Sequence, residues 1–136
     1  MSLIIFDTSV LVNDLRKGSY QDRIQNIAGL IRLSSVVLAE LWRGAVTREE
    51  NELLVRLTRN HPVLPPSEKN WMESGHILKR MRGDLGFHPD KLRMLHFDVL
   101  IALTARSHGA RLITANARDF ELIYRYRKFE LEVWKA

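Results

Sequence analysis

Short apolar runs alternate along the chain with longer segments whose apolar residues recur every three or four positions. The short runs predict strands at residues 3–6, 33–36, 63–64, 111–114 and 129–134. The longer segments predict helices at residues 20–31, 38–45, 49–59, 67–81, 97–108 and 116–123. Gly83 and Gly86 are expected to break the fourth of these helices, and residues 86–95 to form a loop. Strands separated by helices favour an α/β fold: a three-layer α/β/α sandwich around a short, mostly parallel sheet of about five strands.

Length and composition indicate one small globular domain spanning residues 1–136. The hydrophobic content of 46% excludes wholesale disorder, and neither a linker nor a repeat interrupts the chain. The chain has no cysteine, which excludes disulfides and thiolate metal sites and suits a cytoplasmic protein. The opening apolar run is interrupted by Asp7 and has no basic leader, so we interpret it as neither a signal peptide nor a membrane span.

Four acidic residues lie beside apolar runs in four separate segments of the chain. They are Asp7, Glu40, Asp98 and Asp119. Open α/β sheets bind their ligands beyond the carboxyl ends of the strands, where these side chains are expected to meet. Four carboxylates gathered at one edge repel one another unless protons or a cation neutralise them. The pattern therefore predicts a divalent-metal site.

Each of these acidic residues, taken singly, also has an ordinary structural explanation. Asp7 could cap the helix that follows it, and Glu40 could lie on the solvent face of its helix. Asp98 and Asp119 could both be first-turn residues favoured by a helix dipole, with Asn116 capping the second of these helices. Asp98, however, is followed by a run that is apolar nearly all round, so its helix is expected to be buried and its carboxylate to face a cleft.

The ligand type indicates the chemistry of the predicted site. Oxygen-only, carboxylate-rich ligation suits Mg²⁺ or Mn²⁺, which activates water and offsets charge on a phosphate. A carboxylate that the metal does not fully engage, Asp98 or Asp119, is the candidate base. The five histidines show no metal-ligand spacing, and we interpret His96, two residues before Asp98, as a loop histidine.

Charge points to a polyanionic substrate. The net charge is +5, and 15 of the 21 basic residues are arginine, which binds phosphates well. Setting aside the four clustered negative charges leaves +9 for the rest of the chain. Residues 124–128 interleave aromatic and basic side chains, which is typical either of a single-strand-binding surface or of an amphipathic connection into the last strand.

Three stretches carry a resemblance to a known family. They are IIFDTSVL near the start, SSVVLAELWRGA around Glu40, and FDVLIALTARSHGARLITANARDF near the end. In their order and separation they resemble the PIN-domain ribonucleases, and among those the VapC-type toxins of type II toxin–antitoxin pairs. The last stretch is the most specific of the three, because it joins Asp98 to the Thr-x-Asn-x-x-Asp-Phe motif that ends at Phe120.

The resemblance implies a PIN-like fold and a Mg²⁺- or Mn²⁺-dependent endoribonuclease whose metal ligands and catalytic residues are Asp7, Glu40, Asp98 and Asp119. It also implies that Ser9, Thr114 and Asn116 support this site or contact substrate, although they could equally be turn and cap residues. The implied partners are an RNA substrate, a cognate VapB-type antitoxin and a second copy of the chain. Trp42 and the leucines at 53, 54 and 57 would supply apolar surface for that homodimer.

Other functions remain open on the residues alone. A non-catalytic RNA- or protein-binding PIN module would be expected to have lost a carboxylate, and all four are present. A phosphotransfer domain would need a second aspartate beside Asp7, where the chain has Thr8 and Ser9. A metal-dependent DNA nuclease fits as well as a ribonuclease, because no residue identified above would read a 2′-hydroxyl.

Overall fold

The computed structural model describes residues 2–135. Its strands are β1 (Leu3–Phe6), β2 (Leu30–Ser34), β3 (Val63–Leu64), β4 (Arg111–Thr114) and β5 (Glu130–Val133). Its helices are α1 (Thr8–Lys17), α2 (Gln21–Gln25), α3 (Ser35–Gly44), α4 (Arg48–Asn60), α5 (Glu68–Leu85), α6 (Pro89–Ser107) and α7 (Ala117–Tyr126). No helix within the described range is long and apolar enough to cross a membrane.

The five strands form one sheet in the order β3-β2-β1-β4-β5, and every pairing is parallel. The chain moves outward from β1 through β2 to β3, then crosses to the other side of β1 to form β4 and β5. The strand order therefore reverses between β1 and β4. A crevice opens at such a reversal, beyond the carboxyl ends of the strands, and this is where open α/β sheets bind ligands.

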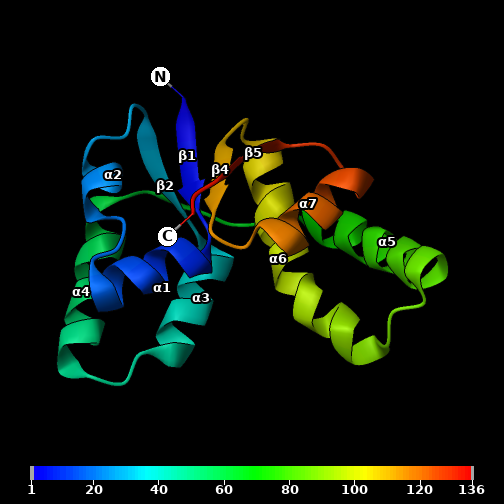
Figure 1. Ribbon diagram of the computed structural model, residues 1–136, viewed down its shortest axis with the longest axis horizontal. Coiled ribbons are helices and arrows are strands. Elements are labelled where there is room, and N and C mark those ends of the chain that lie inside the picture. Colours follow the sequence, from blue (N-terminus) through cyan, green and yellow to red (C-terminus); the bar gives the residue numbers. More distant parts are fainter. Residues whose placement is uncertain (1, 136) are drawn as a thin grey trace.

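Helices cover both faces of the sheet. Successive side chains of a strand point to opposite faces, and Ile4, Ile5 and Phe6 of β1 are all buried. Helices α1 to α4 gather on one side of the sheet, and α5 to α7 on the other (Figure 1). The predicted three-layer α/β/α fold with a five-stranded sheet is confirmed, and the sheet is parallel throughout.

Polar side chains mark where several helices begin. The hydroxyl of Ser34 accepts hydrogen bonds from two backbone amides in the first turn of α3. Thr47 and Glu50 form a reciprocal capping box at the start of α4, and Ser67 and Asn70 form one at the start of α5. These caps satisfy amides that have no partner within the helix. The predicted start of α5 at Ser67 is confirmed.

The predicted helix over residues 20–31 is wrong in its second half. Helix α2 ends at Gln25, and Leu30 and Ile31 belong to β2, which pairs with β1. The three-four spacing of the apolar residues described a helix, but pairing with the buried strand β1 overrides that local pattern. Strand β2 therefore begins earlier than predicted, and α3 begins at Ser35 rather than at Leu38.

The predictions for the next segment also needed correction. Gly83 does not break α5, which continues to Leu85 and ends at Gly86 in the left-handed conformation, with φ of 64°. The predicted loop at residues 86–95 is largely helical, because Pro89 opens α6 at a position that proline favours. Asp98 consequently lies in the middle of α6 and not in its first turn.

Large apolar side chains differ in how far the fold buries them. Trp134 is buried, packs its ring against Phe6 and Tyr20, and thereby closes β5 onto the core. Leu54 is also buried in the core, so it offers no surface to a second copy of the chain, whereas Trp42 is 40% exposed.

Two glycines give a matched test of this backbone. Gly29 has φ of 149°, and a Cβ there would lie 2.5 Å from Ile4 Cδ1 and 2.9 Å from a backbone oxygen. Gly29→Ala should therefore destabilise the fold, on the order of 1–3 kcal/mol, because the left-handed conformation and the clash act together. Gly83→Ala, where a Cβ meets nothing within 4 Å in α5, should stabilise it by about 0.5–1 kcal/mol. Urea unfolding measures both; equal midpoints for the two variants would contradict this account.

Candidate active site

Asp7 lies at the end of β1 and is 3% exposed. Its carboxylate accepts hydrogen bonds from the Ser9 hydroxyl at 2.6 Å, the Thr114 hydroxyl at 2.8 Å and the backbone amide of Val10 at 3.3 Å. The amide contact makes Asp7 the N-cap of α1, so the capping interpretation is correct and leaves the side chain in the crevice. Burial raises the pKa of Asp7, and the hydrogen bonds from Ser9 and Thr114 oppose that rise.

Hydroxyl groups tie the ends of β1 and β4 together. Thr114 ends β4 and donates to Asp7, while Ser9 accepts a hydrogen bond from the backbone amide of Ala115 at 3.0 Å. The Thr114 hydroxyl in turn accepts from the backbone amide of Asn116 at 2.8 Å. Ser9 and Thr114, named from the sequence, thus both contact Asp7 and hold its carboxylate in one orientation.

Glu40 reaches the same edge from α3. The Thr8 hydroxyl donates a hydrogen bond to Glu40 Oε1 at 2.7 Å, and Glu40 is only partly exposed. The solvent-face interpretation of Glu40 is therefore wrong, because the side chain turns towards α1. Thr8 was not among the predicted site residues. Its position directly after Asp7, in the first turn of a helix at the crevice, is the signal that could have found it.

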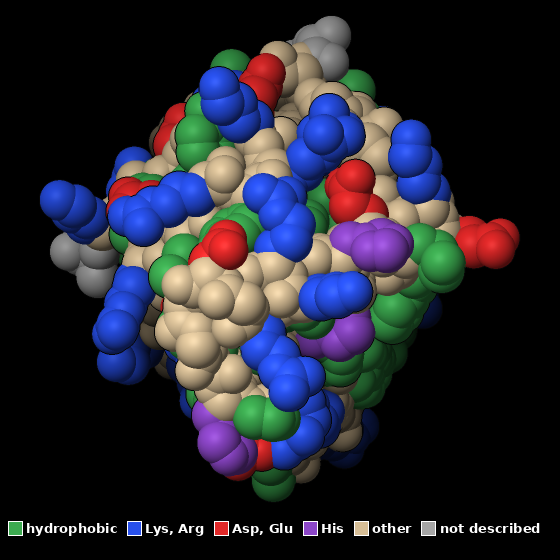
Figure 2. Space-filling model, turned by 90° about the vertical axis from the view of Figure 1, so that its right-hand side faces the viewer, with side chains coloured by type: hydrophobic (Ala, Val, Ile, Leu, Met, Phe, Trp, Pro, Cys, Tyr) green, Lys and Arg blue, Asp and Glu red, His purple; other side chains and the backbone are tan. Residues whose placement is uncertain are grey.

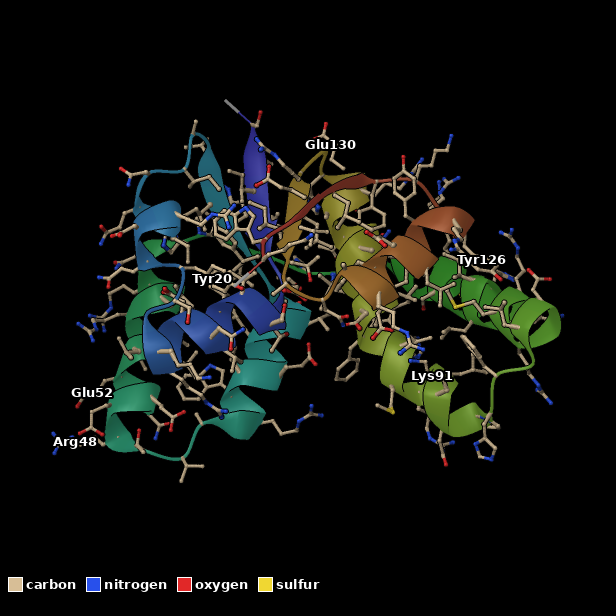
Figure 3. All side chains as sticks on the ribbon, in the orientation of Figure 1. Tyr20, Arg48, Glu52, Lys91, Tyr126 and Glu130 are labelled. Carbon is tan, nitrogen blue, oxygen red and sulfur yellow. The ribbon has the colours of Figure 1, made fainter. Side chains whose placement is uncertain are left out.

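Asp119 projects from the first turn of α7, as predicted, with Asn116 as the helix cap. Asn116 donates to Asp119 Oδ2 at 3.1 Å, and the ammonium of Lys91 lies 3.5 Å from Asp119 Oδ1. Figure 3 shows Lys91 on α6, beside α7. The sequence prediction missed Lys91 because its segment was interpreted as a loop.

Asp98 is the carboxylate most affected by its surroundings. It is half-buried on α6, followed by the fully buried Val99 and Leu100, which confirms that this stretch of the helix lies inside the molecule. The pKa of Asp98 is raised to about 7, chiefly by burial and in addition by the charges of the other three acidic residues, while Lys91 opposes the rise. These three are Asp7, Glu40 and Asp119, so all four carboxylates lie within electrostatic reach at one edge of the sheet.

The four carboxylates suit a hard divalent cation in chemical type, but they are widely spaced in this structure. Within residues 2–135, no three acidic or histidine side chains lie close enough together to hold one ion as they stand. Three of the four carboxylates are held by a neighbour: Asp7 by hydroxyls, Glu40 by Thr8, and Asp119 by Lys91. Like charges favour such separation. Oxygen-only donors at a crevice fit Mg²⁺ or Mn²⁺ in chemical type, and binding would require these side chains to turn inward.

His96 and the aromatic–basic segment, both singled out in the sequence, make contacts outside the carboxylate cluster. His96 is not a loop residue: it lies on α6, Ser74 is within hydrogen-bond distance at 3.0 Å, and its ring packs edge-on against Trp71. Within the aromatic–basic segment at residues 124–128, Tyr126 and Arg127 have structural contacts. Tyr126 donates to Asp84 at 3.0 Å, and Arg127 lies 3.5 Å from Glu73, so both side chains pack against α5.

The raised pKa of Asp98 has a measurable consequence for stability. A carboxyl whose folded pKa (about 7) exceeds its ordinary value of 3.8 favours the folded state at low pH, and this contribution is lost as pH rises from about 4 to 7. Without divalent metal, Asp98→Asn should therefore be more stable than the parent at pH 8, on the order of 1–2 kcal/mol after allowing for solvent screening. The difference should shrink at pH 4–5. Urea unfolding across pH in EDTA measures it.

Glu130→Gln is the control for this experiment. Glu130 is exposed at the start of β5, at the opposite end of the sheet from the site (Figure 3). The substitution should leave the stability curve parallel to that of the parent. A pH-independent effect of Asp98→Asn would show that the four carboxylates do not share one electrostatic environment.

Comparison with known proteins extends the geometric description. Residues 4–126 match the PIN domain. Among curated proteins, the chain is similar to Ribonuclease VapC1 from Rickettsia felis, with 29% identity over 128 residues that cover 88% of this chain and 90% of the relative.

Solved structures agree on the fold. A chain of the VapBC2 complex from Rickettsia felis, bound to a DNA fragment from its promoter, superposes with a TM-score of 0.73 at 24% identity and covers 98% of this chain and 99% of its own length. A chain of the DNA-bound VapBC complex from Salmonella typhimurium gives a TM-score of 0.69 at 23% identity, with the same coverage. The match to the PIN domain spans most of the sequence, from the first strand to the last helix, and the chain therefore belongs to the PIN-domain family.

Proposed function

We propose that this protein is a metal-dependent endoribonuclease of the VapC type, the toxin of a toxin–antitoxin pair. The observation that carries the proposal is the convergence of four carboxylates, from four segments, on the crevice between β1 and β4. Mutual repulsion among four carboxylates lowers the stability of the folded state, and a bound cation would offset it. The similarity to a curated VapC ribonuclease supports RNA as the substrate class.

Asp7, Glu40, Asp98 and Asp119 would hold Mg²⁺ or Mn²⁺ in this proposal. When bound, the cation supplies Lewis acidity: it makes water a better nucleophile near neutral pH and offsets negative charge on the phosphate. Ser9 and Thr114 keep the Asp7 carboxylate turned into the crevice, and Thr8 does the same for Glu40. These hydrogen bonds position the carboxylates at the crevice, from which they would turn inward to a bound cation.

The surroundings of the carboxylates favour Asp98 over Asp119 as the group that accepts a proton from the attacking water. Both Asp119 oxygens are engaged, one by Lys91 and one by Asn116. Asp98 accepts no hydrogen bond from any residue in the described range, and its pKa of about 7 suits proton exchange at neutral pH. No histidine is needed for this step.

A VapB-type antitoxin is the proposed partner. The similar folds come from chains of VapBC complexes, which supports this assignment. In the chain itself, a cavity of about 40 Å³ opens beside Glu40 among apolar side chains of α1, α3 and α4, including Leu15 and Leu41. The cavity also has Arg16 and Glu50 in its lining, and it would accept one small apolar side chain of a bound protein segment next to the acidic edge.

The acidic residues should each be essential for cleavage. We expect Asp7→Asn, Glu40→Gln, Asp98→Asn and Asp119→Asn each to lower turnover by about a hundredfold or more, because each removes a ligand charge while keeping the side-chain shape. Binding of RNA should survive or strengthen, since a negative charge facing phosphate is lost. Cleavage of a single-stranded oligoribonucleotide with Mg²⁺, Mn²⁺ or EDTA measures the first effect, and filter binding the second.

His108→Ala is the control for this panel, because His108 is exposed at the C-cap of α6, where its Nδ1 lies 2.9 Å from the carbonyl oxygen of Thr104. Its turnover should stay within a few-fold of the parent. Robust cleavage in EDTA, or full activity of Asp98→Asn, would refute the proposed site. Equal cleavage of the matched deoxyoligonucleotide would keep the site and overturn RNA as the substrate class.

A homodimer is part of the proposal. Trp42 on α3 is 40% exposed and Val46 in the turn that follows it is 84% exposed, so apolar surface remains at this end of the molecule. Light scattering should give about twice the chain mass of 15.8 kDa, and Trp42→Arg should shift the mass towards the monomer. Met72→Arg, which changes an apolar residue on α5 that is 65% exposed, should not. A monomer mass for the parent at all concentrations would contradict the dimer.

A further inference from the structure

A groove of about 540 Å³ lies beside the acidic site, between the start of α6 and α7. Its charged lining consists of three cations, Lys91, Arg118 and Arg125, and two carboxylates, Asp119 and Glu121, and the aromatic ring of Phe87 lies beside them. Asp119 therefore belongs both to the groove and to the acidic site. A ligand that occupies the groove would extend directly from the carboxylate cluster.

The cations make the groove complementary to a phosphate chain. Arg118 and Arg125 are exposed on α7, and the Lys91 side chain is 37% exposed at the junction with Asp119. Figure 2 views the side of the molecule that carries α5 and α7, and lysine and arginine side chains are spread over it. Basic side chains that flank an acidic metal site favour a substrate that carries a phosphate in the site and further phosphates outside it.

Phe87 adds a surface for a base. It follows Gly86, which ends α5, and it is partly buried against the core, so its ring is held in place. The ammonium of Lys91 lies 6.0 Å from the ring centroid, at the outer limit of a cation–π contact. A base could displace so weak a contact and stack on the ring. Stacking of this kind requires a base that is not already paired in a duplex.

Residues of the aromatic–basic segment at the end of α7 face two different parts of the molecule. Tyr126 and Arg127 turn towards α5, where they contact Asp84 and Glu73. Arg125, which precedes them on α7, lines the groove. Arg125 is therefore placed to meet a strand that leaves the acidic site along α7.

We propose that the groove binds the nucleotide next to the scissile phosphate of a single-stranded RNA. Phe87 stacks on the base, and Lys91 and Arg125 contact the flanking phosphates. This inference rests on the proposed ribonuclease function and adds to it a substrate-positioning site outside the carboxylate cluster. It also explains why Lys91 lies beside Asp119: the same ammonium that pairs with the carboxylate can turn to a phosphate when a cation takes its place.

Equilibrium binding tests the groove without requiring cleavage. The parent for this experiment is Asp98→Asn with saturating Mg²⁺, whose turnover is expected to be lower by about a hundredfold or more, titrated against a fluorescein-labelled single-stranded RNA decamer. Phe87→Leu should weaken binding by about tenfold, as expected for the loss of one stacked base. Arg125→Gln and Lys91→Gln should each weaken it several-fold and reduce its dependence on salt. A fully paired RNA duplex should bind the parent and Phe87→Leu equally.

Two controls match these variants. Tyr124→Leu removes an exposed aromatic ring from α7 that packs on Phe129 outside the groove, and Arg93→Gln removes a cation from α6 that pairs with Asp90. Both should bind the decamer like the parent. If Phe87→Leu fails to fold, the exposed Arg125 and Lys91 carry the test.

The outcomes separate this inference from the proposed function. Unchanged decamer binding by Arg125→Gln and Lys91→Gln would refute RNA binding in the groove. Weakened binding by Tyr124→Leu in place of Phe87→Leu would refute it as well. If the unmodified chain still cleaves RNA in that case, the proposed nuclease function is retained and only the groove is rejected. Conversely, weakened binding in the groove variants with no cleavage by the unmodified chain supports the groove as an RNA site and refutes the nuclease.

Discussion

The buried carboxylate of Asp7 is the constraint on which the site depends. It ends the central strand β1, caps α1, and accepts the Thr114 hydroxyl from the neighbouring strand β4. A charge at 3% exposure is costly unless hydrogen bonds satisfy it, and Ser9 and Thr114 provide them. The same contacts join the two strands at the point where their order reverses. The hydrogen bonds that offset the cost of burying Asp7 therefore also fix the position of the crevice.

Electrostatic repulsion determines how the other carboxylates are arranged. Asp98, Glu40 and Asp119 approach Asp7 from three further segments, and the pKa of about 7 for Asp98 reflects both its burial and these charges. Thr8 and Lys91 hold Glu40 and Asp119 in hydrogen bonds. The proposed cation would replace Lys91 as the neutralising charge. In the further inference, the displaced ammonium then faces substrate phosphate, so that one side chain would serve both states of the site.

Much of the architecture follows from local patterns, and the exceptions have physical reasons. Strand β1 is a continuous apolar run with a polar exit, and β4 is centred on the buried Leu112 and Ile113, so both are predicted at their observed bounds. Leu30 and Ile31 fit a helical stripe equally well, and only pairing with β1 assigns them to a strand. The start of α6 was missed because glycine, histidine and proline at residues 86–89 resemble a loop, although proline is favoured in the first turn of a helix.

The sequence by itself determined the α/β class, the family resemblance and the four acidic candidates, because these depend on residue type, order and spacing. Only the tertiary structure decided which side chains touch them. Thr8 contacts Glu40 across 32 residues, Lys91 contacts Asp119 across 28, and Thr114 contacts Asp7 across 107. No local pattern encodes such pairs, since they arise when the parallel sheet brings the carboxyl ends of distant strands and their helices to one edge.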